Sequence, residues 1–332
     1  MIIINHDVQK QTIHCVGIQD WIAMGVRTDL LRILVLSLLV WSSSSCAALT
    51  ESQLQTVQKL AVSGDSVAVA PSVLFRELAA IRTERGLFYV ASLTGADARF
   101  RELNALAAAA REDEKLAERT DVCVDVLNSY LRALRSISNP TRWKQIGTEM
   151  RGLGNNLDSM ILRFNQLEWV DLELPQGVAK LTGKYAGYLS ENYMKNRQAV
   201  AVYEFVTEGD TLVSVCVDAL VQLLRKQEVQ ELIDNELTGL QNNYLAYLHR
   251  IEVLGQLPSV DHDRRYITLL ENLEKAKSIR NKCVNGLQSL KRAHHKLLTQ
   301  LDKWERWDYW HEELMELNTL AVQLSTLIKE LK

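Results

Sequence analysis

Proline and glycine are scarce in this sequence, which has four prolines and fifteen glycines among its 332 residues. A β-sheet protein of this length needs many turns, and turns depend heavily on these two residue types. The abundant residues are instead Leu, Ala, Glu, Lys, Arg and Gln, all of which favour helices. The sequence therefore predicts an all-α fold, an elongated bundle of long antiparallel helices.

An excess of basic charge is also missing. The chain has 38 basic and 41 acidic residues, which gives a formal net charge of −3. Domains that bind nucleic acids usually carry a net basic charge or a basic stripe. The short basic clusters here, Arg264-Arg265 and Lys291-Arg292, lie among acidic residues. We therefore expect no nucleic-acid partner.

The five cysteines include no Cys-x-x-Cys pair, so their spacing excludes the common metal and redox motifs. Cys123, Cys216 and Cys283 are each in phase with an apolar helical stripe. A buried free cysteine behaves as a small hydrophobic residue, and we favour that role for all three. A disulfide between two of them is the alternative.

Signatures of catalysis and of metal binding are absent too. A di-iron bundle needs paired Glu-x-x-His motifs, which the chain lacks, and His311-Glu312 starts a zinc motif whose second histidine is replaced by Met315. His294 and His295 are adjacent, about 100° apart on a helix, so they are not placed to bind one ion together. We expect no metal, no cofactor and no enzymatic activity. An enzyme or ligand-binding protein with a dispersed site remains an alternative.

The N-terminal segment has the order of a secretory signal. Arg27 and Arg32 precede an uncharged run of nine residues, 33–41, and small residues follow at 42–48. A nine-residue helix is about 14 Å long, whereas a hydrocarbon core is roughly 30 Å thick, so this run is too short to span a membrane. We predict a signal peptide at residues 1–45. Residues 1–23 contain acids that are unusual there, and we hypothesise that translation begins at Met24.

The small residues directly before Cys46 resemble the lipobox of bacterial lipoproteins, and the resemblance covers residues 24–48. Ser43 stands where that class prefers an aliphatic residue, and loose, serine-rich versions are similar to those of Bacteroidetes lipoproteins. The resemblance implies that Cys46 is the lipid-attachment residue, carrying fatty acids such as palmitate, and that residues 46–50 are a short tether. Ala47 favours the outer membrane, by resemblance to enterobacterial sorting. Ordinary cleavage near residues 46–48, which would release a soluble periplasmic protein, is the alternative.

Capping signals and prolines divide the predicted bundle domain, residues 51–332, into helices. Thr50-Glu51-Ser52-Gln53 fits a capping box. Turns are expected at residues 64–66 and 258–263, an interruption at Gly209-Asp210, and a helix cap at Asp263. The expected helices are 50–62, 71–93, 96–138, 142–167, 176–257 and 264–332.

The last of these regions has an apolar spacing that resembles a coiled-coil seam with a local irregularity. The spacing slips near Leu314, and we expect a bend somewhere in the region. We favour a bundle closed within one chain over a dimeric rod. The seam positions are Leu287, Leu290, His294, Leu297, Leu301, Trp304, Asp308 and His311, followed by Leu317, Leu320, Leu324, Leu327 and Leu331.

Trp304, Trp307 and Trp310 form the most unusual local cluster and a candidate interaction surface. One interpretation places them in a thick end of the core, with the indole N–H groups at its rim. The other makes them an exposed platform for a partner, a glycan or lipid headgroups. Trp304 and Trp307 share a face with the seam, so we expect them to be structural. Trp310 is rotated away and is the better candidate for partner contact.

Together these features predict a membrane-tethered lipoprotein of the cell envelope that acts as a non-enzymatic structural or protein-interaction module with an envelope protein partner. One alternative is the dispersed-site enzyme or ligand-binding protein. Another is a membrane-active helical protein resembling the α-pore-forming toxins, although charges interrupt the apolar runs. A cavity lined by converging polar groups would favour an enzyme, and a continuous packed core would favour the interaction module.

Overall fold

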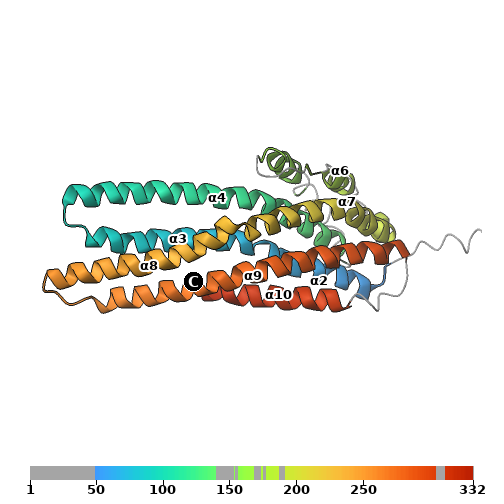
Figure 1. The fold of residues 1–332 in the computed structure, drawn as a ribbon. Helices are drawn as coiled ribbons and strands as arrows, with labels where there is room; N and C mark the ends of the chain where they lie inside the picture. The colour runs from blue at the N-terminus through green and yellow to red at the C-terminus, as the bar shows by residue number, and fades with distance from the viewer. Residues whose placement is uncertain are drawn as a thin grey trace, which may run out of the picture. The chain divides into compact units, whose positions relative to one another are not determined.

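The computed structural model describes residues 49–139, 153, 156–167, 173–174, 177–186, 191–303 and 311–331. All of these residues belong to one compact unit, Ala48–Lys332. No strand occurs among them, and the long helices pack against one another, so the predicted all-α bundle is confirmed (Figure 1). The helices are α2 (Glu51–Ala68), α3 (Ala70–Ser92), α4 (Ala96–Ile137), α6 (Gly177–Ala186), α7 (Glu191–Arg225), α8 (Gln227–Val253), α9 (Val260–Lys303) and α10 (His311–Glu330).

Helices α2 and α3 follow one another along α4. The break between them falls at Val69, because Pro71 occupies the first turn of α3 and has no N–H to continue the hydrogen bonding of α2. Asp65 of α2 forms an ion pair with Arg132, and Arg82 of α3 forms one with Asp113. In these pairs, a higher residue number on α2 or α3 goes with a lower residue number on α4. Helix α4 therefore runs antiparallel to both.

Helices α7 and α8 follow one another along α9 in the same way. The chain breaks at Lys226, whose backbone is extended, with φ −54° and ψ 139°. Arg280 of α9 holds both sides of the break, since its Nε donates to the Leu224 carbonyl and its Nη1 donates to Gln230. The interruption predicted at Gly209-Asp210 is wrong, because α7 runs through both residues.

Helix α10 folds back along α9. Lys282 donates to Gln323, and Arg292 pairs with Glu316, so the two helices are antiparallel. The expected bend is therefore a full reversal of the chain between Lys303 and His311. The slip in apolar spacing near Leu314 falls in the first turns of α10, where the second half of the seam begins on a separate helix. The seam residues of α9 are fully buried: Leu287, Leu290, His294, Leu297 and Leu301.

Two other expected boundaries differ from the structure. The turn predicted at residues 64–66 is wrong, since α2 continues through it; Gly64 lets α9 approach, and a Cβ there would lie 2.8 Å from Cδ1 of Leu290. The helix expected to begin at residue 264 begins at Val260, four residues earlier. The Thr50 capping box is confirmed, with both of its hydrogen bonds present at 2.8 and 3.2 Å.

The buried side chains form one continuous hydrophobic cluster through the described helices. Cys123, Cys216 and Cys283 are part of it as free, buried thiols, which confirms their expected role as small hydrophobic residues. Burial raises the pKa of the Cys123 thiol to about 12 and raises the pKa of the other two thiols as well. These thiols are therefore protonated and unreactive at neutral pH.

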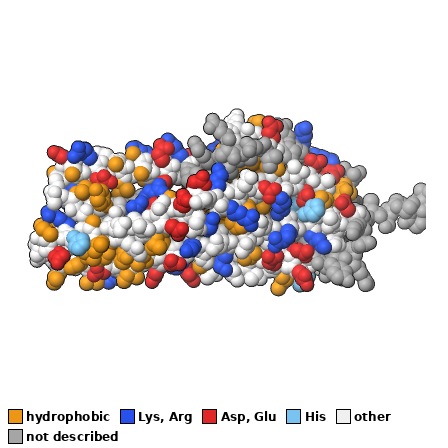
Figure 2. Space-filling model, in the orientation of Figure 1, with side chains coloured by type: hydrophobic (Ala, Val, Ile, Leu, Met, Phe, Trp, Pro, Cys, Tyr) orange, Lys and Arg blue, Asp and Glu red, His pale blue; other side chains and the backbone are white. Residues whose placement is uncertain are grey.

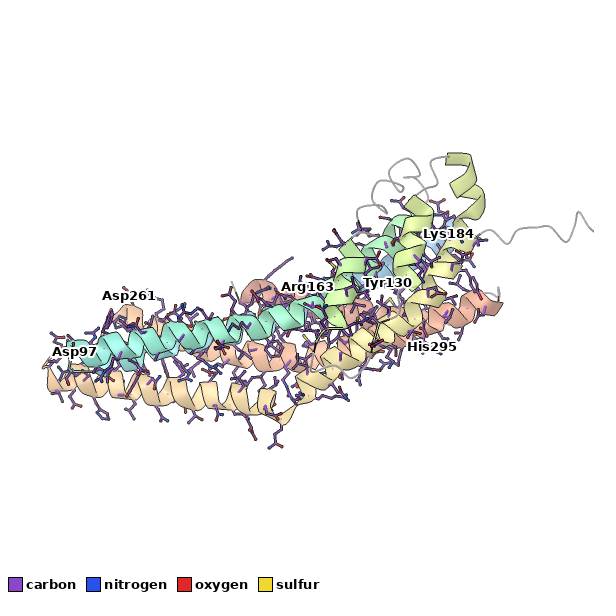
Figure 3. All side chains as sticks on the ribbon, turned by 90° about the horizontal axis from the view of Figure 1, so that it is seen from above. Asp97, Tyr130, Arg163, Lys184, Asp261 and His295 are labelled. Carbon is purple, nitrogen blue, oxygen red and sulfur yellow. The ribbon has the colours of Figure 1, made fainter. Side chains whose placement is uncertain are left out.

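The bundle has two regions with different neighbours. The distal region comprises residues 75–116 and 227–275, where α3 packs against the first half of α4, against α8 and against the first half of α9. The proximal region comprises the other described residues, where α2, α7 and α10 pack against the second halves of α4 and α9. Asp97 and Asp261 mark the distal end in Figure 3, and Tyr130 and His295 lie in the proximal region.

Candidate functional site

Exposed hydrophobic side chains gather at the distal end, where the loops 93–95 and 254–259 join α3 to α4 and α8 to α9. Figure 2 shows these hydrophobic side chains over that end of the bundle. Six other large hydrophobic residues that are exposed lie scattered over the rest of the described chain. We call the gathered set the apolar tip: Leu87, Tyr89, Phe100, Leu103, Leu245, Val253, Leu254, Leu257, Val260 and Ile267.

The loop between α8 and α9 is the most exposed part of the apolar tip, and Leu257 within it is 92% exposed. Helix α8 ends in a glycine cap: Gly255 has a φ of +63°, its N–H donates to the Glu252 carbonyl, and the N–H of Gln256 donates to the Ile251 carbonyl. Ser259 accepts the first backbone N–H groups of α9. The loop is therefore a defined turn whose backbone is tied to both helices.

A cluster of aromatic rings supports the tip from below. Tyr244 and Tyr266 are stacked with their ring centroids 4.2 Å apart, and Phe88 of α3 meets Tyr244 edge-on at 4.9 Å. The hydroxyl of Tyr244 donates to Asp263, and burial together with this hydrogen bond raises the pKa of the tyrosine. The role of helix cap predicted for Asp263 is wrong, since Ser259 caps α9 and Asp263 holds Tyr244. The rings fix both helical hairpins to one another.

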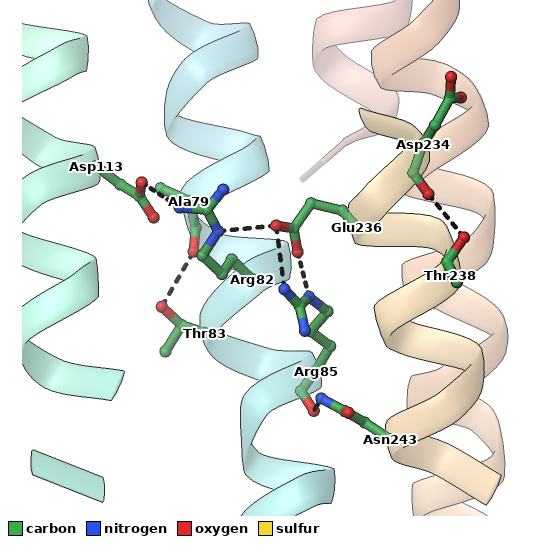
Figure 4. Close-up of polar contacts among 9 residues, drawn as sticks. All are labelled: Ala79, Arg82, Thr83, Arg85, Asp113, Asp234, Glu236, Thr238 and Asn243. Atoms are coloured by element: carbon green, nitrogen blue, oxygen red, sulfur yellow. Dashed lines mark hydrogen bonds and ion pairs between the residues drawn. The ribbon is translucent and has the colours of Figure 1, made fainter. Parts of the chain in front are cut away.

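A buried carboxylate lies farther along the same helices (Figure 4). Glu236 of α8 is 1% exposed and accepts hydrogen bonds from two arginines of α3, Arg82 at 2.8 Å and Arg85 through two nitrogen atoms. Arg82 also donates to Asp113 of α4 at 2.6 Å. The Asn243 side chain donates to the Arg85 carbonyl. These contacts join three helices and set the positions of the hairpins that carry the apolar tip.

The charges of this network depend on one another. Burial alone would lower the pKa of Arg82, but the hydrogen bond and the charge of Glu236, together with Asp113, raise it above its ordinary value. Burial raises the pKa of Asp113, Arg82 opposes that rise, and the nearby charge of Glu236 adds to it. Arginines in this setting stay charged, and they neutralise a carboxylate that would otherwise be costly to bury.

A second polar group lies in the proximal region and comes from three helices. The Tyr130 hydroxyl of α4 lies 2.6 Å from Nε2 of His294 on α9, and Nδ1 of His294 lies 3.0 Å from Oδ1 of Asp210 on α7. His295 approaches the other carboxylate oxygen of Asp210 at 3.1 Å. Burial tends to raise the pKa of Asp210, but the hydrogen bonds from both histidines outweigh it and lower that pKa. The adjacent histidines thus converge on one carboxylate.

This second group resembles a proton relay in its order of tyrosine, histidine and acid. Tyr130 and His294 are nevertheless fully enclosed, and burial raises the pKa of the tyrosine well above its ordinary value. Gly209 allows the ring of Tyr130 to lie against α7, since a Cβ there would be 2.3 Å from the ring. The arrangement satisfies buried polar groups and fastens α4, α7 and α9 together.

The linings of two surface hollows include no member of either polar group. One, of about 520 Å³, lies between α9 and α10 beside Arg292, Glu316 and Gln323. The other, of about 390 Å³, lies between α3 and α4 beside Arg76, Glu84 and Glu114. Within the described ranges, no group of three or more His, Cys, Asp or Glu residues is arranged to hold a metal ion.

The site residues predicted from the sequence fall outside the described part of the chain. These residues are Cys46 at the predicted lipid attachment and Trp304, Trp307 and Trp310 of the predicted interaction surface. The apolar tip was not predicted. Its signal was available in the uncharged stretch 253–260, Val-Leu-Gly-Gln-Leu-Pro-Ser-Val, which is too apolar for an ordinary surface turn.

Comparison of the chain with protein-family models, with curated proteins and with solved structures finds no match. Among the described helices, none combines the length and the apolar character that crossing a bilayer requires.

Proposed function

We propose that this chain is a lipid-anchored envelope protein whose helical bundle acts as a non-enzymatic interaction module, with the apolar tip as its contact surface. The observation that carries the proposal is the gathering of exposed hydrophobic side chains on two joined hairpins. Exposed hydrophobic side chains that gather in one place on a protein surface mark sites of interaction.

The structural setting of the tip supports the same function. Stacked rings and the buried Glu236 network hold the two hairpins in a fixed relation. A contact surface that is rigid before binding loses less conformational entropy when a partner docks. The continuous packed core favours an interaction module over an enzyme, and the buried Tyr130 and His294 are enclosed away from any substrate.

The anchor belongs to the proposal through the sequence. The signal-like segment and Cys46 would tether the chain to a membrane, by resemblance to bacterial lipoproteins, and Ala47 would favour the outer membrane. Two or three acyl chains make such attachment stable. We expect Cys46→Ala to abolish fatty-acid labelling and to move the protein from the membrane fraction to the soluble fraction. Unchanged fractionation and labelling of this variant would overturn the lipoprotein assignment.

The interaction role has its own test. A photoreactive amino acid at Leu257 should crosslink to a neighbouring molecule in intact cells, because this side chain is the most exposed of the tip. The matched control carries the same amino acid at Val322, an exposed hydrophobic residue of α10 outside the tip. Crosslinking at residue 257 above the level at residue 322 supports the proposal. The proposal is overturned if residues 257 and 322 both crosslink only at background level, to lipids as well as to proteins.

A further inference from the structure

We infer that the apolar tip binds a lipid surface, with the loop between α8 and α9 entering the interfacial layer of a bilayer. The inference rests on the proposed function and names the partner of the same tip. Residues 253–260 contain no charged side chain. Four large hydrophobic residues in this stretch are exposed: Val253, Leu254, Leu257 and Val260. Ile267 extends the exposed face of α9 one heptad beyond Val260.

The backbone of this loop is hydrogen-bonded within the chain at both of its ends. An unsatisfied backbone N–H or C=O is costly in a bilayer, so a segment that enters one must satisfy these groups internally. The glycine cap of α8 satisfies the carbonyls of Ile251 and Glu252, and Ser259 receives backbone N–H groups of α9. Pro258 has no N–H to satisfy. The loop therefore presents apolar side chains on a backbone whose two ends are hydrogen-bonded within the chain.

The charges around the loop favour an anionic surface. Arg250 lies one turn before the apolar residues of α8, and Arg99 and Arg101 flank the exposed Phe100 on α4. Among the described residues, no carboxylate forms an ion pair with any of these three arginines. Long arginine side chains can bury their stems beside apolar surface while the guanidinium reaches phosphate.

The three acidic side chains nearest in sequence to the α8–α9 loop each lie beside a polar or basic group. Asp261 pairs with Arg264 at 2.7 Å, Glu252 lies 3.6 Å from His249, and Asp263 accepts the hydroxyl of Tyr244. On α4, Asp97 lies in the first turn, where a negative charge is favourable, and Glu102 adds one more acid. Cationic groups with no ion pair thus surround an uncharged apex, which complements anionic headgroups over an apolar layer.

The shape of the surface also favours lipid over a folded protein. Both views show that the loops joining α3 to α4 and α8 to α9 lie at the distal end of the two hairpins, so the surface around these loops is convex (Figures 1 and 3). A rigid protein partner needs a matching hollow to bury a convex apex, whereas lipids rearrange around it. The pairing of protruding apolar side chains with nearby arginines is the chemistry that binds anionic interfaces.

The test places a fluorophore in the loop of the full chain. Gln256→Cys is labelled with an environment-sensitive dye in a chain that carries Cys15→Ala and Cys46→Ala, and the three buried thiols do not react. Vesicles of phosphatidylcholine with phosphatidylglycerol should shift the emission to the blue, and high salt should weaken the response.

Leu254→Gln with Leu257→Gln should weaken partitioning about tenfold or more. Arg99→Gln, Arg101→Gln and Arg250→Gln together should remove the preference for phosphatidylglycerol over phosphatidylcholine alone.

Met315→Gln with Val322→Gln is the matched control, because it removes two exposed hydrophobic residues outside the tip and should leave the response unchanged. No emission change with either vesicle overturns the lipid inference. If crosslinking at residue 257 then captures a protein, the inference fails while the proposed interaction function stands. If crosslinking captures nothing, both fail. A blue shift that the leucine substitutions abolish and the control does not supports the inference.

Discussion

The proximal and distal regions are built from the same long helices but are held together by different forces. Most core side chains of the proximal region are fully enclosed, whereas Leu240 is the one core residue of the distal region with no exposed area in the described chain. Rings and the Glu236 ion network take a larger share of the distal contacts. Aliphatic burial mainly supplies stability, and directional polar contacts mainly fix geometry. The apolar tip, which we propose to be functional, lies on the distal region, where directional polar contacts fix the geometry.

The largest effect should come from opening the proximal core. Leu287→Ala removes a fully buried side chain of α9 and should lower the free energy of unfolding by about 2–5 kcal/mol. Leu269→Ala, on the same helix in the distal region, should cost about 2 kcal/mol because the core around it is less completely enclosed. Denaturant unfolding of both variants gives the comparison. A larger cost for Leu269→Ala than for Leu287→Ala would break the distinction between the regions.

The Glu236 network should be the main polar contribution to the distal region. Glu236→Gln leaves Arg82 and Arg85 without their shared carboxylate and should cost about 2–3 kcal/mol, less than a fully buried pair because both arginines are partly exposed. Replacing all three together, by Arg82→Met, Arg85→Met and Glu236→Leu, should restore most of that loss. Denaturant unfolding of the single and triple variants tests this. A triple variant less stable than Glu236→Gln would show that the charges themselves stabilise the region.

Close packing in the proximal region should make Gly209 hard to replace. Gly209→Ala places a methyl group against the ring of Tyr130 and should cost about 1–3 kcal/mol by overpacking. Gly183→Ala in α6 is the control, since no atom lies within 4 Å of its Cβ position, and it should stabilise the helix by about 0.5–1 kcal/mol. Thermal unfolding measures both changes. Equal effects at the two glycines would contradict the observed packing.

Acid should weaken the proximal region through Asp210. Both histidines hold the pKa of Asp210 in the folded chain below its ordinary value despite burial. The resulting stability is present above the unfolded pKa of about 3.9 and is lost as the pH falls through the lower folded pKa. Wild type should therefore lose more stability than Asp210→Asn on acidification through this range. Asp218→Asn, which removes an exposed pair with Lys291, should behave like wild type in the same titration.

The smallest effect on stability should come from the apolar tip. Leu257→Gln changes a side chain that is 92% exposed and should alter the free energy of unfolding by less than about 0.5 kcal/mol. Leu257 thus has a proposed role in contact and no expected role in stability. It therefore tests the contrast between the two regions most directly. Unfolding of the purified variant measures it. A loss above about 1 kcal/mol would mean that Leu257 packs within the fold.

The sequence predicts the local features of this fold well and the long-range ones less well. The Thr50 capping box, the start of α3 near Pro71 and the extent of α4 all depend on a few neighbouring residues, and all are confirmed. Gly209-Asp210 has the composition of a helix break, yet Gly209 is there because Tyr130, 79 positions earlier in the chain, packs against it. The real break at Lys226 depends on Arg280, which is also distant in sequence and binds Leu224 from 56 positions away. A pattern of neighbouring residues does not predict contacts with partners so distant in sequence.

The same limit applies to the candidate site. The two adjacent histidines differ in burial, since His294 is enclosed and His295 is exposed. That both reach Asp210 depends on the antiparallel packing of α7 and α9, which the pattern of either helix alone does not specify. The apolar tip likewise joins residues near 100 and 257 that only the fold brings to one end.

Helix α9 has a consequence for how the chain is made. It packs against α2, α3, α7, α8 and α10, and it begins at residue 260 of 332. A ribosome adds about 5–20 residues per second from the N-terminus, so the earlier helices emerge well before the element that encloses them. Until α9 emerges, the apolar faces of α2, α3, α7 and α8 lack their common partner. The bundle therefore reaches its complete packing only after α9 has emerged, when most of the chain has already been synthesised.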